Sequence, residues 1–217
     1  MLRRTFAVCP LAVAACALTG RRALAHAAPQ PDLLSAATRR FLVLAQGFGG
    51  LPAAERHPVL NRHVNQLVDY AVDADVCGAR DCWQTPAETL ASGRGDCEDG
   101  AILKYFLLCH CSPAGGPRLV YAQCAAVLPG GAPLAHVVVI ADADAADPLV
   151  LDCIDGAPQP QPLSRRADLR PLFSFDARGL WRGVTHEHIG DAAVRLLPWR
   201  GVLQRWAGQQ RQAALPH

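Results

Sequence analysis

The sequence predicts an α+β fold, with helices in the first half of the chain and antiparallel strands in most of the second. Apolar residues recur at helical spacing over residues 33–46 and 61–73. Short, partly β-branched apolar runs separated by turn residues begin only after residue 118. Residues 26–217 are enough for one domain with a substantial core, so we expect a single domain there.

Residues 1–25 are typical of a secretory signal peptide. Arg3 and Arg4 precede an apolar stretch that is too short to span a membrane comfortably, and Ala23-Leu24-Ala25 resembles a cleavage site. Two variants stay open: a lipid anchor at Cys16 and a twin-arginine signal. Each of them predicts export.

The charge and the cysteine count exclude one class of function and point to an unpaired thiol. The signal segment holds four arginines and no acid, so its removal changes the formal charge from +2 to −2. A nearly neutral domain without a basic cluster does not suggest nucleic-acid binding. Two of the nine cysteines lie in residues 1–25, and the remaining seven leave at least one thiol unpaired in an oxidising compartment. That thiol is either a buried structural cysteine or the functional group.

Capping and turn residues divide the helical half. After the helices at 33–46 and 61–73, Thr85 is a helix cap, Pro86 occupies the first helical position, and Glu88 closes a capping box. Glycines at 93 and 95 then predict a tight turn into another helix over residues 97–108.

The second half reads as strands and turns. We expect strands within residues 119–127, 135–141 and 149–154, followed by a Pro-rich loop and irregular structure as far as Trp181. A final amphipathic helix over residues 194–207 is expected to be interrupted early by Pro198.

The start of the helix at 97 carries a candidate nucleophile, Cys97. With Asp96 as the helix cap, the helix dipole favours the Cys97 thiolate by about 0.3–1 kcal/mol. A carboxylate about 7 Å away opposes it by roughly 2 kcal/mol, so Asp96, Glu98 and Asp99 together should suppress the thiolate. A catalytic Cys97 therefore needs a charged histidine or a bound cation, and hard oxygen ligands suit Ca²⁺. Ordinary capping would also explain Asp96 and Asp99.

His136 and Asp152 are candidates for the base and its orienting acid. If residues 135–141 and 149–154 pair antiparallel, the two positions share one face of the sheet as direct or diagonal neighbours, about 5–8 Å apart. A carboxylate there can fix the imidazole tautomer. The alternative is a hydrogen-bonded histidine at a sheet edge.

Other chemistry-bearing residues are weaker candidates. Cys109-His110-Cys111 is spaced too tightly for a usual zinc site, and His186 with His188 favours a solvated turn. We expect Lys104 to be solvated and Tyr105 to pack. A disulfide between Cys77 and Cys82 stays open.

Several segments occur together in the order of one known family. They are residues 83–90 (Trp-Gln-Thr-Pro-Ala-Glu-Thr-Leu), 93–99 (Gly-Arg-Gly-Asp-Cys-Glu-Asp), Lys104-Tyr105, the strand with His136, 149–152 (Leu-Val-Leu-Asp), 173–175 (Phe-Ser-Phe) and 179–181 (Gly-Leu-Trp). Over residues 61–206 the chain resembles the bacterial transglutaminase-like cysteine proteinases of the LapG type.

The resemblance implies a papain-like, transglutaminase-type fold, with the nucleophile at a helix N-terminus packed against an antiparallel sheet. It implies a periplasmic, calcium-dependent endopeptidase that cleaves the N-terminal region of a large surface adhesin near paired alanines and so releases cells from a biofilm. An inner-membrane receptor for cyclic di-GMP would sequester the protease. We expect a monomer or a weak dimer.

The resemblance also assigns roles to residues. The nucleophile corresponds to Cys97, the base to His136 and the orienting acid to Asp152. Calcium ligands correspond to Asp96 and Glu98, with Asp99 and Asp81 as further candidates.

The chain departs from the family pattern at four positions. Cys77 and Cys82 replace expected aromatic residues, which fits a local disulfide. Cys153 replaces an expected asparagine and is placed to form an inhibitory bond with Cys97, and Gly100 replaces an expected aromatic residue. Two other functions stay open: acyl transfer to an amine by a true transglutaminase, and a catalytically silent, disulfide-bonded binding domain.

Overall fold

The computed structural model describes residues 30–78, 81–111, 116–125, 132–153 and 159–215. The signal peptide expected at residues 1–25 and the lipid anchor considered at Cys16 lie outside these ranges. Within them, no helix has both the length and the apolar content that crossing a bilayer requires.

Helices and strands are arranged as the α+β class requires. The described helices are α1 (Pro31–Gly49), α2 (Ala53–Leu67), α3 (Asp73–Val76), α4 (Pro86–Ser92), α5 (Cys97–Cys111), η1 (Leu163–Arg165), α6 (Ala192–Arg195) and α7 (Leu197–Ala213). The strands are β1 (Asp69–Tyr70), β2 (Arg94–Gly95), β3 (Arg118–Cys124), β4 (Leu134–Ala141), β5 (Leu149–Leu151), β6 (Gln161–Pro162), β7 (Leu169–Phe175), β8 (Leu180–Arg182) and β9 (His188–Gly190).

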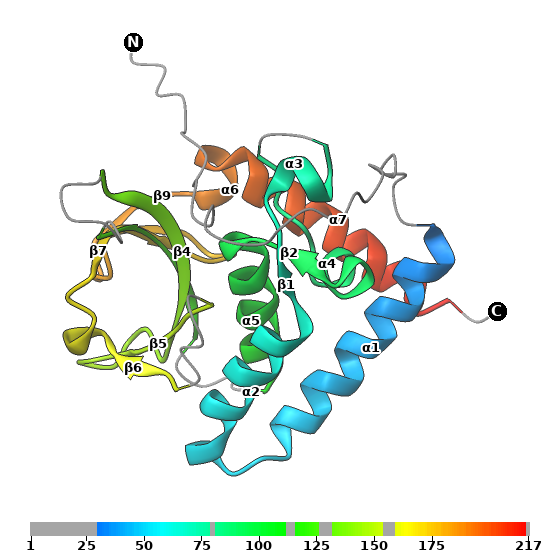
Figure 1. Ribbon diagram of the computed structural model, residues 1–217, viewed down its shortest axis with the longest axis horizontal. Coiled ribbons are helices and arrows are strands. Elements are labelled where there is room, and N and C mark those ends of the chain that lie inside the picture. Colours follow the sequence, from blue (N-terminus) through cyan, green and yellow to red (C-terminus); the bar gives the residue numbers. More distant parts are fainter. Residues whose placement is uncertain (1–29, 79–80, 112–115, 126–131, 154–158, 216–217) are drawn as a thin grey trace, which may run out of the picture.

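One curved antiparallel sheet faces the helices. Its strand order is β6-β5-β4-β3-β7-β8-β9, while β1 and β2 form a separate parallel pair. In Figure 1 the sheet lies to one side and α5 runs between it and α1. Strands β3 and β4 bury both faces, since alternate residues enter a core against the helices and a smaller cluster on the other face. This explains their unbroken apolar runs.

Helix α5 is the centre of the core because it is apolar on nearly every side. Trp199 of α7 packs against it and is fully buried. Its ring contacts Tyr105 and Phe175 edge-on, each with a centroid separation of 5.5 Å. Its indole N–H donates to the carbonyl of Asp176 at 3.1 Å, so the polar end of the ring is also satisfied. As expected, Tyr105 is a packing residue.

We expect Trp199→Ala to lower the free energy of unfolding by about 3–5 kcal/mol, because it empties a large volume in the core and leaves a carbonyl without its donor. Urea unfolding followed by circular dichroism measures the loss. Trp181→Ala is the control and should cost less, since Trp181 is only half-buried. Equal losses for the two variants would contradict the larger contribution assigned to the buried Trp199 ring.

Two sequence-based boundaries were wrong and one was confirmed. The helix expected at residues 61–73 is α2, which begins at Ala53 and ends at Leu67, because residues 69–70 leave it to pair with residues 94–95. The region expected to be irregular up to Trp181 contains β7 and β8. The helix expected at residues 194–207 is interrupted early, as predicted, because α6 ends at Arg195 and α7 begins at Leu197. Pro198 lies in the first turn of α7, where a proline costs no hydrogen bond.

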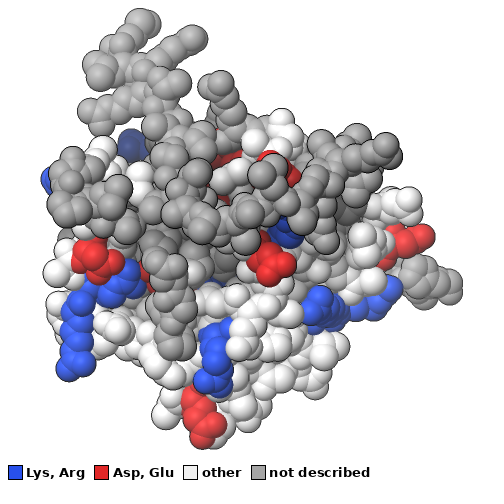
Figure 2. Space-filling view, in the orientation of Figure 1, with Lys and Arg blue, Asp and Glu red and all other residues white. Residues whose placement is uncertain are grey.

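Charge is distributed thinly over the described surface. On the face in Figure 2, lysines and arginines lie in small separate groups, several of them beside an acid. This view agrees with the absence of a basic cluster in the sequence.

Candidate active site

Cys97 is the first residue of α5 and is 8% exposed. The side chain of Asp96, immediately before the helix, accepts from the Glu98 N–H at 3.2 Å, so Asp96 caps the helix as expected. The Cys97 thiol donates to Glu98 Oε2 at 2.6 Å. Among the described cysteines, Cys97 is a free thiol.

The turn before α5 is fixed by Asp99. This fully buried carboxylate accepts from the backbone N–H of Gln84 at 2.8 Å and from its side-chain Nε2 at 2.6 Å. Gly95 is required there, because a Cβ at that position would lie 2.6 Å from the Cβ of Asp99. Burial raises the pKa of Asp99 to about 7 despite the bonds from Gln84. Asp99 thus anchors the segment that presents Cys97.

His136 and Asp152 form a buried pair. His136 lies on β4 and is 4% exposed, and its Nε2 is 2.7 Å from Oδ1 of Asp152, which is 2% exposed. Because Ile140 pairs with Val150 and Val139 with Leu151, positions 136 and 152 are diagonal neighbours on one face. The parity argument therefore predicted the relation correctly, although Asp152 lies one residue beyond β5.

Besides His136, three side chains hold Asp152, and the sequence had marked only one of them, Lys104, which was expected to be solvated. Its Oδ2 accepts from Arg166 Nη2 at 2.7 Å. Its backbone carbonyl accepts from Lys104 Nζ at 2.9 Å and from Asn65 Nδ2 at 2.8 Å. Burial alone would raise the pKa of Asp152, but the bonds from His136 and Arg166 hold it below its ordinary value.

The expectation that Lys104 is solvated was wrong. Its side chain is 1% exposed, and burial lowers its pKa to about 8. The ammonium group of a lysine on an apolar helix usually reaches water. The ammonium group of Lys104 instead donates to the backbone carbonyl of Asp152, the residue that pairs with His136.

A second group of acids gathers beside Cys97. Oxygen atoms of Asp73, Asp96 and Asp99 lie within 4.8 Å of one another, and so do ligand atoms of Asp96, Cys97 and Glu98. Asp81 belongs to neither group, although it lines the same cavity.

Asp73 reaches this group because β1 pairs with β2, which joins the segment before α3 to the segment before α5. A disulfide between Cys77 and Cys82 closes the next loop. Within that loop, the Cys82 N–H donates to Asp73 Oδ2 at 2.9 Å. No local motif marks Asp73 in the sequence, since its contact with Asp96 depends on that long-range pairing.

Burial and the neighbouring acids both disfavour the Cys97 thiolate, and the charge argument predicted the second of these effects. Burial comes first and the neighbouring Glu98 second in raising the pKa of Cys97 well above its usual range. Burial and Glu98 also raise the pKa of Asp96. Burial and the neighbouring carboxylates therefore disfavour the Cys97 thiolate.

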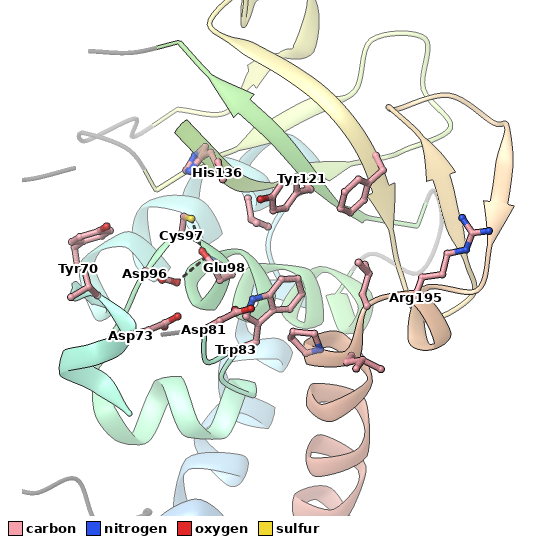
Figure 3. A pocket seen from close by; sticks show the side chains of 17 residues that line it. Tyr70, Asp73, Asp81, Trp83, Asp96, Cys97, Glu98, Tyr121, His136 and Arg195 are labelled. Carbon is pink, nitrogen blue, oxygen red and sulfur yellow. Dashed lines mark hydrogen bonds between the residues drawn. The ribbon is translucent and has the colours of Figure 1, made fainter. Parts of the chain in front are cut away.

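Cys97 and His136 line one cavity of about 360 Å³. Figure 3 shows the sulfur of Cys97 directed toward the His136 ring, with the acids Asp73, Asp81, Asp96 and Glu98 gathered on one side of the site. The rest of the wall is largely apolar and includes Trp83, Tyr121, Val137, Phe173, Leu196, Leu197 and Pro198. Such a cavity joins a thiol and an imidazole to a surface for apolar side chains.

The two zinc candidates do not form sites among the described residues. Neither Cys109-His110-Cys111 nor His186 with His188 belongs to a described group of three potential ligands. His110 instead lies 3.0 Å through Nδ1 from the Phe106 carbonyl and contacts the Phe41 ring. Glu187, between the other two histidines, pairs with Arg182 on the surface.

A central helix that begins with a free thiol and packs against an antiparallel sheet defines the class of fold as transglutaminase-like. No family model matches the chain, and a search of curated proteins finds no similar sequence.

Solved structures of LapG from Legionella pneumophila do match. The calcium-bound form is 30% identical, with a TM-score of 0.62, and the alignment covers 81% of this chain and 96% of that one. The EGTA-treated form is 27% identical, with a TM-score of 0.66, and 82% and 98% are covered. A third LapG structure is 26% identical, with a TM-score of 0.64 and the same coverage as the EGTA-treated form. The chain belongs to the LapG family.

Proposed function

We propose that this protein is an exported, calcium-dependent cysteine endopeptidase in which Cys97 is the nucleophile, His136 the general base and Asp152 the acid that orients His136. The observation that carries the proposal is the buried 2.7 Å contact between His136 and Asp152 in the cavity that also holds Cys97. An imidazole held by a carboxylate on one nitrogen has the other free to exchange a proton with a thiol.

The reaction follows the usual course of acyl transfer to a thiol. His136 takes the Cys97 proton, the thiolate attacks the peptide carbonyl, and His136 returns the proton to the leaving amine. Water then hydrolyses the thioester with His136 again as the base. The Cys97 N–H is one of the helix-start donors without an intrahelical partner, so it is positioned to stabilise the oxyanion.

The residues present fit a calcium ion. Asp73, Asp96 and Glu98 offer hard carboxylate oxygens, and Asp73 Oδ1 is buried without a hydrogen-bond partner in the described structure. When bound, calcium supplies positive charge that neutralises these acids. Asp96 and Glu98 would hold the ion, and its charge would offset the negative charge that raises the pKa of Cys97. Calcium-bound and EGTA-treated LapG structures support this assignment by analogy.

The acid group makes stability depend on pH in a direction opposite to that of most carboxylates. Burial raises the pKa values of Asp73 and Asp99 in the folded protein above the ordinary value near 3.9. Above about pH 4 the folded state therefore binds more protons than the unfolded chain, so raising the pH lowers the free energy of unfolding until these groups are ionised.

We expect the thermal midpoint in EGTA to fall as the pH rises from about 5 to about 8, and calcium to oppose the fall because it competes with protons for the same oxygens. Differential scanning calorimetry with and without calcium measures the gap between the midpoints. The gap should widen with pH. A gap that stays constant over this range would place calcium elsewhere.

We propose that the substrate is the N-terminal region of a large surface adhesin, cut near paired alanines, and that cleavage releases cells from a biofilm. Cleavage would take place in the periplasm after removal of residues 1–25, with or without a lipid anchor at Cys16. An inner-membrane receptor for cyclic di-GMP would bind the protease, which is otherwise a monomer or a weak dimer. The resemblance of the motifs and the LapG family support these assignments.

Thioester chemistry on a transglutaminase-like fold also permits transfer of the acyl group to an amine. The two outcomes separate when a purified adhesin fragment is incubated with the calcium-loaded protein and an amine such as dansylcadaverine. Peptide fragments without label support the protease. Label incorporated into intact substrate supports the transferase, and an unchanged substrate supports a silent binding domain.

A further inference from the structure

Both oxygens of the Asp152 carboxylate have a side-chain partner. Its Oδ1 meets His136 Nε2 at 2.7 Å, and its Oδ2 accepts from Arg166 Nη2 at 2.7 Å. The side chains of Asp152 and Arg166 are 1% and 14% exposed. Exposed ion pairs contribute little because water screens them, but this pair is shielded enough to hold its geometry.

Other hydrogen bonds also hold Arg166 in place beside Asp152. Its Nε donates to Asp168 Oδ1 at 2.9 Å and its Nη2 to Asp168 Oδ2 at 2.7 Å, so Asp168 binds the planar guanidinium through two nitrogens, one of which also donates to Asp152. Its backbone is held too, since the Arg166 N–H donates to the Leu163 carbonyl and the Leu169 N–H to the Arg166 carbonyl.

The charged and titratable groups around Asp152 come from several elements. They are His136 on β4, Lys104 on α5, the adjacent Cys153, and Arg166 with its partner Asp168 between η1 and β7. Lys104 reaches only the backbone carbonyl. Arg166 is thus a permanent cation hydrogen-bonded to the carboxylate itself, on the oxygen opposite the one that faces His136.

We propose that Arg166, clamped by Asp168, is a positioning residue that aims Asp152 at His136 and thereby sets the reactivity of Cys97. The inference rests on the proposed function only in taking Cys97, His136 and Asp152 as the reacting set. Without Arg166 the carboxylate keeps the Cys153 N–H and His136 on Oδ1 but loses the cation on Oδ2. The orientation of the carboxylate and of His136 then loosens, and proton transfer from Cys97 becomes less frequent.

The test measures the rate at which iodoacetamide alkylates Cys97 in calcium-containing buffer, with the modified peptide quantified by mass spectrometry. Arg166→Gln should slow alkylation about tenfold, as expected for loss of one charge-assisted hydrogen bond. It should also move the acid limb of the rate–pH profile to higher pH, because Asp152 becomes easier to protonate. Arg166→Lys should recover part of the rate. Arg165→Gln, which alters the neighbouring cation, should leave rate and profile unchanged.

A double-mutant cycle separates positioning from a general effect on folding. If Arg166 acts through Asp152, then Arg166→Gln should add nothing to the loss caused by Asp152→Asn. Should Arg166→Gln lower the thermal midpoint too far for assay, Asp168→Asn keeps both charges of the pair and should still slow alkylation about twofold to threefold.

Two results would overturn the inference: wild-type alkylation in both Arg166→Gln and Asp168→Asn, or additive losses in the cycle. Alkylation needs no peptide substrate. A protein that alkylates as expected but cleaves nothing would therefore refute the proposed function and leave the role of Arg166 standing.

Discussion

Replacing Cys97 with alanine is expected to lower the rate of peptide cleavage by about 10⁴-fold or more, because no other group can form the thioester. The fold should persist, since alanine fits at the start of α5 and the Asp96 and Asp99 contacts do not use the thiol. Cleavage of a purified adhesin fragment, followed by gel electrophoresis and mass spectrometry, measures the loss.

Cys109→Ala is the matched control, because Cys109 is another free thiol on the same helix and lies outside the cavity. It should cleave at the wild-type rate. Cleavage that survives in Cys97→Ala would remove this thiol from the mechanism, whatever the control does.

Replacing His136 with alanine is expected to slow cleavage by about 10³-fold or more, since the thiol then has no base and the leaving amine no proton donor. Burial and Glu98 raise the pKa of Cys97, so the thiol depends on a base to lose its proton. Alanine also leaves the buried Asp152 with one partner fewer, and for that reason His136→Gln should be measured beside it.

Added imidazole offers a second readout for the same variant. It should restore part of the rate in His136→Ala, where there is space for it, and none in Cys97→Ala. If both His136 variants fold and cleave at the wild-type rate, another group must be the base.

Much of the site could be predicted from local sequence patterns. The capping residues around α4 and α5 and the two-residue period of β4 and β5 depend on neighbours in the chain. They located Cys97 at a helix start and gave His136 and Asp152 a common face. The prediction that Asp96, Glu98 and Asp99 disfavour the Cys97 thiolate also needed only their closeness to Cys97 in the sequence.

The parts that the sequence did not reveal depend on contacts between distant segments. Asp73 joins the acids only because β1 pairs with β2, and Lys104 is buried only because α5 is covered on all sides. Strand β7 was missed because its alternation is interrupted by Pro171, which lies where the register with β3 shifts. Arg166 follows a short 3₁₀ turn that has no periodic pattern.

The departures at Gly100 and Cys153 are neighbours in space. A Cβ added at Gly100 would lie 3.8 Å from the Cβ of Cys153, which is ordinary contact, so the two positions face each other beside the site. Cys153 is a free thiol. Its inhibitory bond with Cys97 stays a prediction, which non-reducing peptide mapping after mild oxidation can test.

The most direct test of the account is the mass of the products formed from a purified N-terminal adhesin fragment in calcium. The wild-type protein should give one cut near paired alanines, with two product masses that together equal the substrate plus one water. EGTA or Cys97→Ala should leave the substrate intact, and restoring calcium should restore only the wild-type activity. An uncut fragment with the calcium-loaded wild type, or the same cut with Cys97→Ala, would contradict the account.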